Sequence, residues 1–236
     1  RWLPRLLGEK YVFVNVPAFR LEGYEAGRKT IEMKVIVGQE FDGRSTPVFS
    51  DKMEYVVFRP YWNVTPTIAA NELFPQFAAT GMPADYGTYT EDGKLRVPQK
   101  HGEKNSLGLV KFLFPNDFNI YLHDTPNDKL FEKDVRAFSH GCIRLEKPAE
   151  LAEWVLGWDR SRVDKMMHGA NNRTITLKNK LPVYIVYLTS YVRDGALWFG
   201  NDLYSRDVEL AQAVAGGAVP SAEAVRNVAA LRKLTD

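Results

Sequence analysis

The sequence predicts an α+β fold that is rich in β-strands, with a few peripheral helices and a lid-like insertion. Runs of β-branched and aromatic residues fill much of residues 11–59, and Pro or Gly closes most of them. Clear helical periodicity is confined to short segments further along the chain, of which residues 148–157 are the best example. Residues 78–106 are polar, rich in Gly and Pro and nearly aperiodic, which is typical of a functional lid or of a disordered insert.

Strands dominate the first quarter of the chain. They are expected at residues 11–16, 19–24, 30–37 and 53–58. Apolar residues alternate in the third of these, so Ile31, Met33, Val35 and Val37 should share one face. Residues 41–49 contain Asp42-Gly43 and Pro47 and are expected to form a loop.

The remaining elements are shorter. A helix is predicted over residues 67–77, with Thr67 as N-cap and Pro75 limiting its far end. Strands are expected at residues 109–114, 119–122, 173–177, 183–192 and 196–199, the last two joined by a turn at Asp194-Gly195. Helices are expected at 148–157 (between Pro148 and Gly157), at 161–168 behind a capping box that starts at Ser161, at 207–215 and at 221–234.

Composition excludes several classes of protein. The 236 residues suffice for one large domain or two small ones. A net charge of +2 gives no field that would attract nucleic acid, so no nucleic-acid partner is expected. No apolar run approaches the roughly 20 residues that a membrane span needs. A single cysteine excludes an internal disulfide and a multi-cysteine zinc site.

That cysteine, Cys142, stands in the stretch Ser139-His140-Gly141-Cys142-Ile143-Arg144. A lone cysteine is more often a small buried hydrophobe than a nucleophile. The surroundings favour the nucleophile here, because Gly141 permits close backbone approach and polar side chains crowd the same turn. His123, which lies 19 residues upstream at the end of an expected strand, completes a thiol–imidazole pair.

His123 is the better candidate for the general acid and base, since it can take the thiol proton and pass it to a leaving amine. Its other ring nitrogen needs an acceptor, which is either Asp124 or a backbone carbonyl near it. His140 is two residues from Cys142, so in an extended segment both side chains face the same way, and His140 would steady the thiolate or an oxyanion. The amides of Gly141 and Cys142 are further candidates for oxyanion donors.

Arg144 has two interpretations. It would orient the loop or bind a substrate carboxylate, or it would form a structural ion pair with Glu146 or Asp134. A metal site built from His123, Asp124, His140 and Cys142 has the right residue types but lacks a recognised ligand spacing. We therefore expect no metal and no cofactor.

Two motifs together resemble a known family. Tyr121-x-His123-Asp124-Thr125-Pro126 followed by Ser139-His140-Gly141-Cys142-Ile143-Arg144 resembles the L,D-transpeptidase (YkuD-like) catalytic domain, most closely its large periplasmic branch typified by YcbB. Further segments resemble that branch in the same order: 17–21, 59–64, 105–108 with 111–112, 147–148 with 151–152, and 202–204. The likeness covers about residues 2–207. Two features depart from the branch: His140 stands where Ser is usual, and the insert between Asn63 and Asn105 is shorter.

The resemblance implies a mixed sheet or β-sandwich core with the nucleophile at one end of a sheet. It implies that Cys142 and His123 form 3→3 cross-links between peptidoglycan stem peptides through a thioester, in the bacterial periplasm or cell envelope, and that carbapenems inhibit covalently. The expected substrate-binding residues are Tyr61, Trp62, Tyr121, Asp124 and Ser139.

The expected domain organisation follows from the same likeness. Residues 1–10 would end an upstream linker or helix, 11–206 would form the catalytic domain with a flap at about 64–106, and 207–236 would be a helical extension. Since the chain starts at Arg1 without a Met, the natural protein is expected to begin earlier.

Two alternatives remain open. The same pair of residues with water as acceptor would make an L,D-carboxypeptidase or another cell-wall cysteine peptidase. A non-catalytic cell-wall binding domain would need none of the polar residues around Cys142, so the intact motif argues against it.

Overall fold

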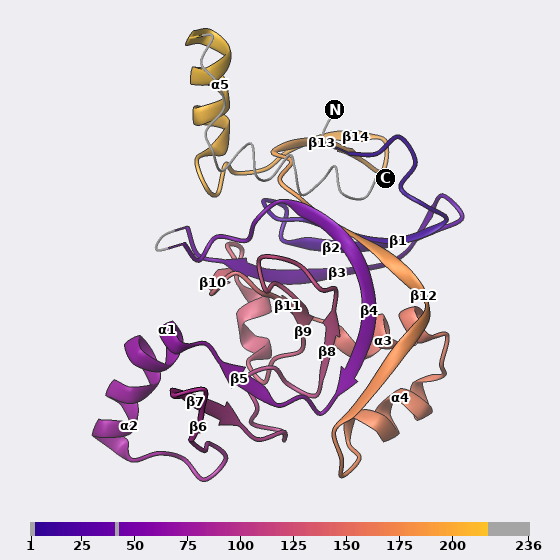
Figure 1. The fold of residues 1–236 in the computed structure, drawn as a ribbon. Helices are drawn as coiled ribbons and strands as arrows, with labels where there is room; N and C mark the ends of the chain where they lie inside the picture. Colours follow the sequence, from indigo (N-terminus) through magenta and orange to yellow (C-terminus); the bar gives the residue numbers. More distant parts are fainter. Residues whose placement is uncertain (1–2, 41–42, 217–236) are drawn as a thin grey trace.

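The computed structural model describes residues 3–40 and 43–216, and Figure 1 labels most of its elements. The strands are β1 (Lys10–Asn15), β2 (Arg20–Glu25), β3 (Arg28–Gly38), β4 (Phe49–Phe58), β5 (Trp62–Val64), β6 (Tyr89–Glu91), β7 (Lys94–Gln99), β8 (Val110–Leu113), β9 (Leu122–His123), β10 (Ala137–Ser139), β11 (Ile143–Leu145), β12 (Arg173–Val186), β13 (Ser190–Arg193) and β14 (Ala196–Phe199). The helices are α1 (Pro66–Ile68), the π-helical segment η1 (Ala69–Leu73), α2 (Phe74–Thr80), the 3₁₀ turn η2 (Asp128–Glu132), α3 (Pro148–Leu156), α4 (Arg160–Met167) and α5 (Arg206–Gly216).

A mixed sheet forms the centre of the molecule, as predicted. Its nine strands run in the order β10-β3-β11-β9-β8-β4-β12-β1-β2, and β2 also pairs with β3, so the sheet closes on itself. The pairs β1–β12, β9–β11 and β3–β10 are parallel, and the other pairs are antiparallel. Because β9 and β11 are neighbours, the ends of two segments far apart in the sequence meet at one place (Figure 1).

One apolar core fills the space between the sheet and helices α3 and α4. The four alternating residues of β3 that were predicted to share a face are all buried in it. Leu151 of α3 and Val163 of α4 are fully buried in the same core. Burial of a side chain of this size contributes about 1.5–3 kcal/mol, so the two helices are held mainly by these contacts. Gly157 ends α3 in a left-handed conformation (φ +64°), as its position predicted.

Three helix boundaries differ from the expectation. The first helix follows Thr65 and not Thr67. Pro75 lies in the first turn of α2, directly after η1, and the helix continues to Thr80. Helix α4 is capped by Asp159, whose carboxylate accepts the Arg162 N–H at 2.8 Å, and not by Ser161.

The expected strands at residues 173–177 and 183–192 are also organised differently. β12 runs without a break from Arg173 to Val186, with an irregular register between Thr176 and Leu181. Such an irregularity bends a strand without ending it. The second half of the expected strand is the separate β13, which pairs with β14 in the predicted hairpin. The expected helix at 207–215 is α5, whereas that at 221–234 lies outside the described residues.

The insertion between β5 and β8 has a sheet of its own, although residues 78–106 looked aperiodic. β5, β7 and β6 form a three-stranded antiparallel sheet, and a small second core packs between it and the helical segment. That core consists of Val64, Ala69, Leu73 and Val97. β7 was not predicted from the sequence, because Pro98 and two charged residues interrupt the alternation of apolar and polar residues.

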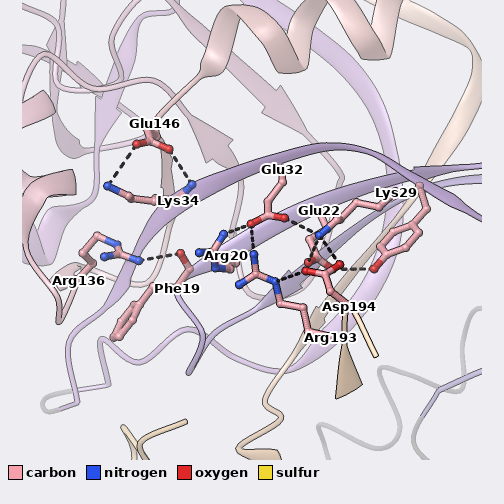
Figure 2. A network of polar contacts seen from close by, with 11 residues as sticks. Phe19, Arg20, Glu22, Lys29, Glu32, Lys34, Arg136, Glu146, Arg193 and Asp194 are labelled. Carbon is pink, nitrogen blue, oxygen red and sulfur yellow. Dashed lines mark hydrogen bonds and ion pairs between the residues drawn. The ribbon is translucent and has the colours of Figure 1, made fainter. Parts of the chain in front are cut away.

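An ionic network ties the hairpin β13–β14 to β2 and β3 (Figure 2). Glu32 binds Arg20 of β2, Lys29 of β3 and Arg193 of β13, the last with an N–O distance of 2.6 Å. Lys29 also lies 3.4 Å from Asp194 at the hairpin turn. These charges are partly exposed, so their attraction is screened by solvent and their main effect is to orient the hairpin. A cavity of about 510 Å³ lies beside the network and contains none of the candidate site residues.

The described parts of the chain include no helix that is both long and apolar enough to cross a membrane. Residues 3–9 form neither a helix nor a long strand, and the predicted domain limits stay predictions.

Candidate active site

A row of basic side chains crosses three adjacent strands. Lys111 of β8 is paired with His123 of β9, and His123 is paired with Arg144 of β11. Directly paired residues point to the same face of a sheet. Tyr121 and Cys142 each lie two residues before a member of this row, so they point to that face as well. Five chemically active side chains are thereby gathered at one place.

The opposite face of the same strands explains this orientation. Phe112, Leu122 and Ile143 alternate with the polar residues and are completely buried in the main core. A slip of one residue in β9 would move Leu122 out of the core and His123 into it. The apolar pattern therefore fixes the register, and the register fixes which polar side chains meet.

His123 is held in one tautomer by a backbone group. Its Nδ1 lies 2.5 Å from the carbonyl oxygen of Asp124, and a carbonyl only accepts hydrogen bonds, so Nδ1 carries the proton and Nε2 is the unprotonated nitrogen. The sequence left this partner open between the carboxylate and a backbone carbonyl. Burial lowers the pKa of His123 to about 3, and the nearby charges of Arg144 and Lys111 act in the same direction. The imidazole is thus a neutral base at neutral pH.

The carboxylate of Asp124 is occupied elsewhere. It accepts the N–H groups of Leu109 and Thr125, both at 2.7 Å. Its side chain also fills the space at Gly108, where an added Cβ would lie 2.3 Å from the carboxyl group. Burial raises the pKa of Asp124 to about 6, although both amide hydrogen bonds favour the ionised form. In this structure Asp124 shapes the loop beside His123, and its predicted contact with substrate stays a prediction.

Cys142 is half-buried, with its sulfur 3.8 Å from the carbonyl oxygen of Asn119. Burial raises the pKa of the thiol above its ordinary value. Hydrogen bonds from Tyr121 and the charges of Arg144 and Lys111 oppose this rise. The free site therefore holds a neutral thiol and a neutral imidazole on the same face of the sheet, and a proton must leave the thiol before the thiolate can react.

Tyr121 contacts both members of the pair. Its ring lies 5.6 Å from that of His123, and its hydroxyl is a hydrogen-bond partner of the Cys142 sulfur. The ammonium of Lys111 lies 5.6 Å from the centre of the Tyr121 ring, a distance that fits a cation–π contact. Tyr121 was predicted to line the site, whereas no property of the sequence singled out Lys111.

The turn that presents the thiol, residues 139–142, is stabilised by hydroxyl groups. Ser139 Oγ donates to the Cys142 carbonyl at 2.5 Å and accepts the Gly141 N–H at 3.1 Å. Gly141 has φ +114°, which a residue with a side chain rarely adopts. Since the Gly141 amide is engaged with Ser139, its predicted role toward an oxyanion stays a prediction.

A buried network of hydroxyl groups links this turn to the end of β3. Thr46 Oγ1 donates to the Gly141 carbonyl at 2.8 Å and accepts the Gly38 N–H at 2.9 Å. Tyr204 accepts the Thr46 N–H and donates to the Gly38 carbonyl at 2.6 Å. Thr46 is fully buried, so each of these groups would lose its partner if the network broke. Thr46 was not predicted from the sequence, because single threonines in loops are common.

His140 contacts the insertion. Its Nε2 lies 2.6 Å from Oε1 of Glu72 on η1, and Arg44 Nη2 lies 3.2 Å from the same oxygen. Among the described residues, Glu72 is the carboxylate that contacts the Cys142 turn. The predicted role of His140 in supporting the thiolate stays a prediction.

The side chain of Arg144 is mostly buried and lies near the Cys142 thiol. No ion pair joins it to Glu146 or Asp134 within the described residues, and Glu146 instead lies 3.6 Å from Lys34 (Figure 2). The Nε of Arg144 is buried without a hydrogen-bond partner in that same part of the chain. An unpaired guanidinium beside a thiol is suited to receive a carboxylate of a substrate.

The two other predicted aromatic residues lie around the insertion. Trp62 packs against the small core of that segment and pairs with Gln99. Tyr61 is about half exposed and packs edge to face with His101. Neither has a contact with Cys142 or His123. In the described ranges, no group of three or more His, Cys, Asp and Glu residues is arranged to hold a metal ion.

The chain is similar in sequence to a known family and to one of its described members. Residues 9–185 match the sequence model of the YkuD L,D-transpeptidase catalytic domain. A Haemophilus influenzae protein described as "Putative L,D-transpeptidase" is 32% identical over 222 residues, which covers 84% of this chain and 45% of the relative. This chain thus spans less than half of the relative's length.

Solved structures of low sequence identity are also similar in part. An L,D-transpeptidase from Mycobacterium smegmatis is 14% identical, with a TM-score of 0.38 over 75% of this chain and 58% of the other. L,D-transpeptidase 3 from Mycobacterium tuberculosis is 13% identical, with a TM-score of 0.40 over 75% and 61%. A third L,D-transpeptidase, in complex with imipenem, is 16% identical, with a TM-score of 0.38 over 75% and 59%. Because the family model spans most of residues 3–216, this chain belongs to the YkuD family of L,D-transpeptidase catalytic domains.

Proposed function

We propose that this domain joins peptidoglycan stem peptides by 3→3 cross-links through a thioester on Cys142. The observation that carries the proposal is the common face of Cys142, His123 and Tyr121, with the cations Lys111 and Arg144 beside them. Family membership supports the reaction class. The YcbB-type branch and a location in the periplasm belong to the same proposal.

In the first half-reaction, Cys142 Sγ attacks the carbonyl carbon of the third residue of a donor tetrapeptide. His123 Nε2 takes the thiol proton as the C–S bond forms. The tetrahedral intermediate collapses, the C–N bond to the terminal D-alanine breaks, and His123 gives its proton to the leaving amine. The unpaired cations of Lys111 and Arg144 suit the terminal carboxylate of the leaving residue, which is lost as a free amino acid.

In the second half-reaction, the side-chain amine of the third residue of an acceptor stem attacks the thioester carbonyl. His123 takes a proton from the amine and returns it to the departing sulfur, so an amide forms and the thiol is regenerated. A partly buried thioester persists long enough for this transfer when water is kept out. Water as the acceptor would release a tripeptide, which is the carboxypeptidase alternative.

A carbapenem offers a strained carbonyl to the same thiol. Ring opening keeps every atom of the drug on the protein, so the mass of the adduct is the sum of both. The experiment is the intact mass of the domain after incubation with imipenem and, separately, with a stem tetrapeptide. We expect an adduct of full drug mass on the wild type and none on Cys142→Ala.

The same tetrapeptide incubation separates the alternatives. Cross-linked dimers support transfer, and tripeptide alone supports hydrolysis. Folded wild-type domain that forms no adduct with either compound would contradict the covalent mechanism and favour the non-catalytic binding domain.

A further inference from the structure

The insertion brings one carboxylate to the Cys142 turn. Glu72 lies on η1, 68 residues before His140, and its Oε1 is shared between His140 Nε2 at 2.6 Å and Arg44 Nη2 at 3.2 Å. All three side chains are partly exposed, with accessible fractions of 39% for Glu72, 31% for His140 and 25% for Arg44. The group is therefore accessible from solvent, and it adjoins the turn that carries the thiol.

The second carboxylate oxygen of Glu72 is available. Both polar contacts are made through Oε1, and no residue in the described part of the chain donates a hydrogen bond to Oε2. An ionised carboxylate accepts about four hydrogen bonds, so Glu72 retains capacity for another donor. Its position is fixed by two partners, which reduces the entropy that binding would cost.

The charges around Cys142 are separated in space. In the sheet order, β11 has β9 and β8 on one side, which carry His123 and Lys111, and β3 on the other. Arg44 and Glu72 lie on the β3 side, since Arg44 follows that strand and its carbonyl oxygen is 3.6 Å from the Cβ position of Gly141. The carboxylate of Asp124 is bound to the amides of Leu109 and Thr125 and offers no second negative charge to the site.

We propose that Glu72 binds the ammonium group of the acceptor, and so determines whether the thioester is taken by an amine or by water. This inference rests on the proposed transpeptidase function. An incoming primary amine is mostly protonated at neutral pH, so Lys111 of β8 and Arg144 of β11 repel it. Glu72 attracts it from the β3 side, where it lies next to the turn that carries the thioester.

The proton balance of the step is complete. The ammonium bound by Glu72 releases one proton to solvent and becomes a neutral amine. The amine attacks the thioester carbonyl, the C–N bond forms, and the C–S bond breaks. The second proton passes through His123 to the Cys142 sulfur. Glu72 binds and places the nucleophile, and it exchanges no covalent bond.

The test measures acylation and transfer separately in Glu72→Gln. Donor acylation, followed as adduct formation with imipenem and as D-alanine release, should stay within about twofold of wild type. The KM for the acceptor stem should rise about tenfold, which is the size expected for the loss of one charged hydrogen bond, and the share of hydrolysed tripeptide should increase. Glu91→Gln is the matched control, because Glu91 is an exposed carboxylate of the same insertion, paired with Arg96.

A neutral nucleophile distinguishes ammonium binding from a structural effect. Hydroxylamine is uncharged at pH 7.5, so its attack on the thioester should be equally fast in Glu72→Gln and wild type. If the variant slows acylation or hydroxylamine attack as much as stem transfer, Glu72 only positions His140 and the inference is wrong. Unchanged acceptor KM overturns it as well. Absence of any acyl-enzyme on wild type overturns the proposed function itself.

Discussion

The imidazole Nδ1 of His123 contacts the backbone carbonyl of Asp124 at 2.5 Å, while the carboxylate of Asp124 binds the amides of Leu109 and Thr125. A backbone carbonyl does not titrate, so it holds the ring in one tautomer at every pH at which the imidazole is neutral. In a pair oriented by a carboxylate, that carboxylate would also stabilise the imidazolium. Here the protonated ring has no such partner, and the cations beside it lower its pKa further.

This arrangement predicts different effects for adjacent substitutions. His123→Gln should fold and lose at least about 100-fold in kcat/KM for donor turnover, because the proton acceptor is gone. Asp124→Asn should lose about 1–3 kcal/mol of stability, since its oxygen keeps one backbone N–H donor while the new NH₂ group faces the other, and it should keep most of its kcat. Urea denaturation and D-alanine release measure the two quantities. His168→Gln, at an exposed helix end, serves as control, and a comparable loss of turnover in it would show that the base is wrongly assigned.

The thiol should titrate above pH 9, because burial raises the pKa of Cys142 from its ordinary 9.0. Alkylation by iodoacetamide follows the thiolate fraction, so its rate should rise with pH to an inflection above that value. Lys111→Met should move the inflection higher, since it removes a cation that favours the thiolate. Lys178→Met changes an exposed lysine on β12 and should leave it unmoved. An inflection near neutrality would mean that a thiolate–imidazolium pair exists before substrate binds.

Stability should depend on pH through His123. Its folded pKa of about 3 lies below the ordinary 6.5, so between these values the unfolded chain binds more protons and stability falls as the pH falls. Asp124 has the opposite effect on stability. Between pH 3.8 and about pH 6 the folded state binds more protons through this carboxyl group, so stability rises as the pH falls. The two contributions to stability offset each other between pH 3.8 and about pH 6. Below pH 3.8 only the contribution of His123 still changes with pH.

Asp124 is present in both proteins, so we expect the free energy of unfolding of the wild type to drop relative to His123→Gln as the pH falls from 6.5 towards about 3. The difference should change by up to about 1.4 kcal/mol per pH unit. Urea midpoints at several pH values measure it. A constant difference between the two proteins from pH 7 to pH 3.5 would contradict the lowered pKa.

The hydroxyl network under the turn gives a fourth prediction. Thr46→Val keeps the shape of the side chain but leaves the Gly38 N–H and the Gly141 carbonyl without partners in a buried place. We expect a loss of about 1–3 kcal/mol in stability and a slower acylation of Cys142. Thr46→Ser, which keeps the hydroxyl, should restore most of the acylation rate. Equal acylation rates in all three proteins would show that the network does not position the thiol.

The sequence predicted those parts of the fold and site that depend on local pattern. Alternation located β3, and Pro148 with Gly157 delimited α3, because each is set by residues a few positions apart. Cys142 stood out because it is the one cysteine of the sequence and shares a turn with Gly141 and polar residues, and His123 because it follows an expected strand. β7 was missed because Pro98 breaks its pattern, yet pairing with β5 and β6 on both sides stabilises it.

The contacts that the sequence could not predict all depend on register or on long-range packing. Lys111 belongs to the site only because β8 pairs with β9 at that residue. Tyr204 reaches Gly38 across 166 residues, and Glu72 reaches His140 across 68. No spacing in the chain encodes such distances, since they follow from how the closed sheet and the insertion pack.

The π-helical segment that carries Glu72 has a further consequence. In η1 the Phe74 N–H bonds to the Ala69 carbonyl, five residues back, so this turn holds one residue more than an α-helical turn. Removal of a single residue there would restore α-helical spacing and rotate Glu72 by about 100° around the helix axis. The carboxylate would then turn away from His140 with no change of residue type. In this chain the number of residues between Pro66 and Pro75, and not merely the presence of a glutamate, therefore determines whether the carboxylate faces His140.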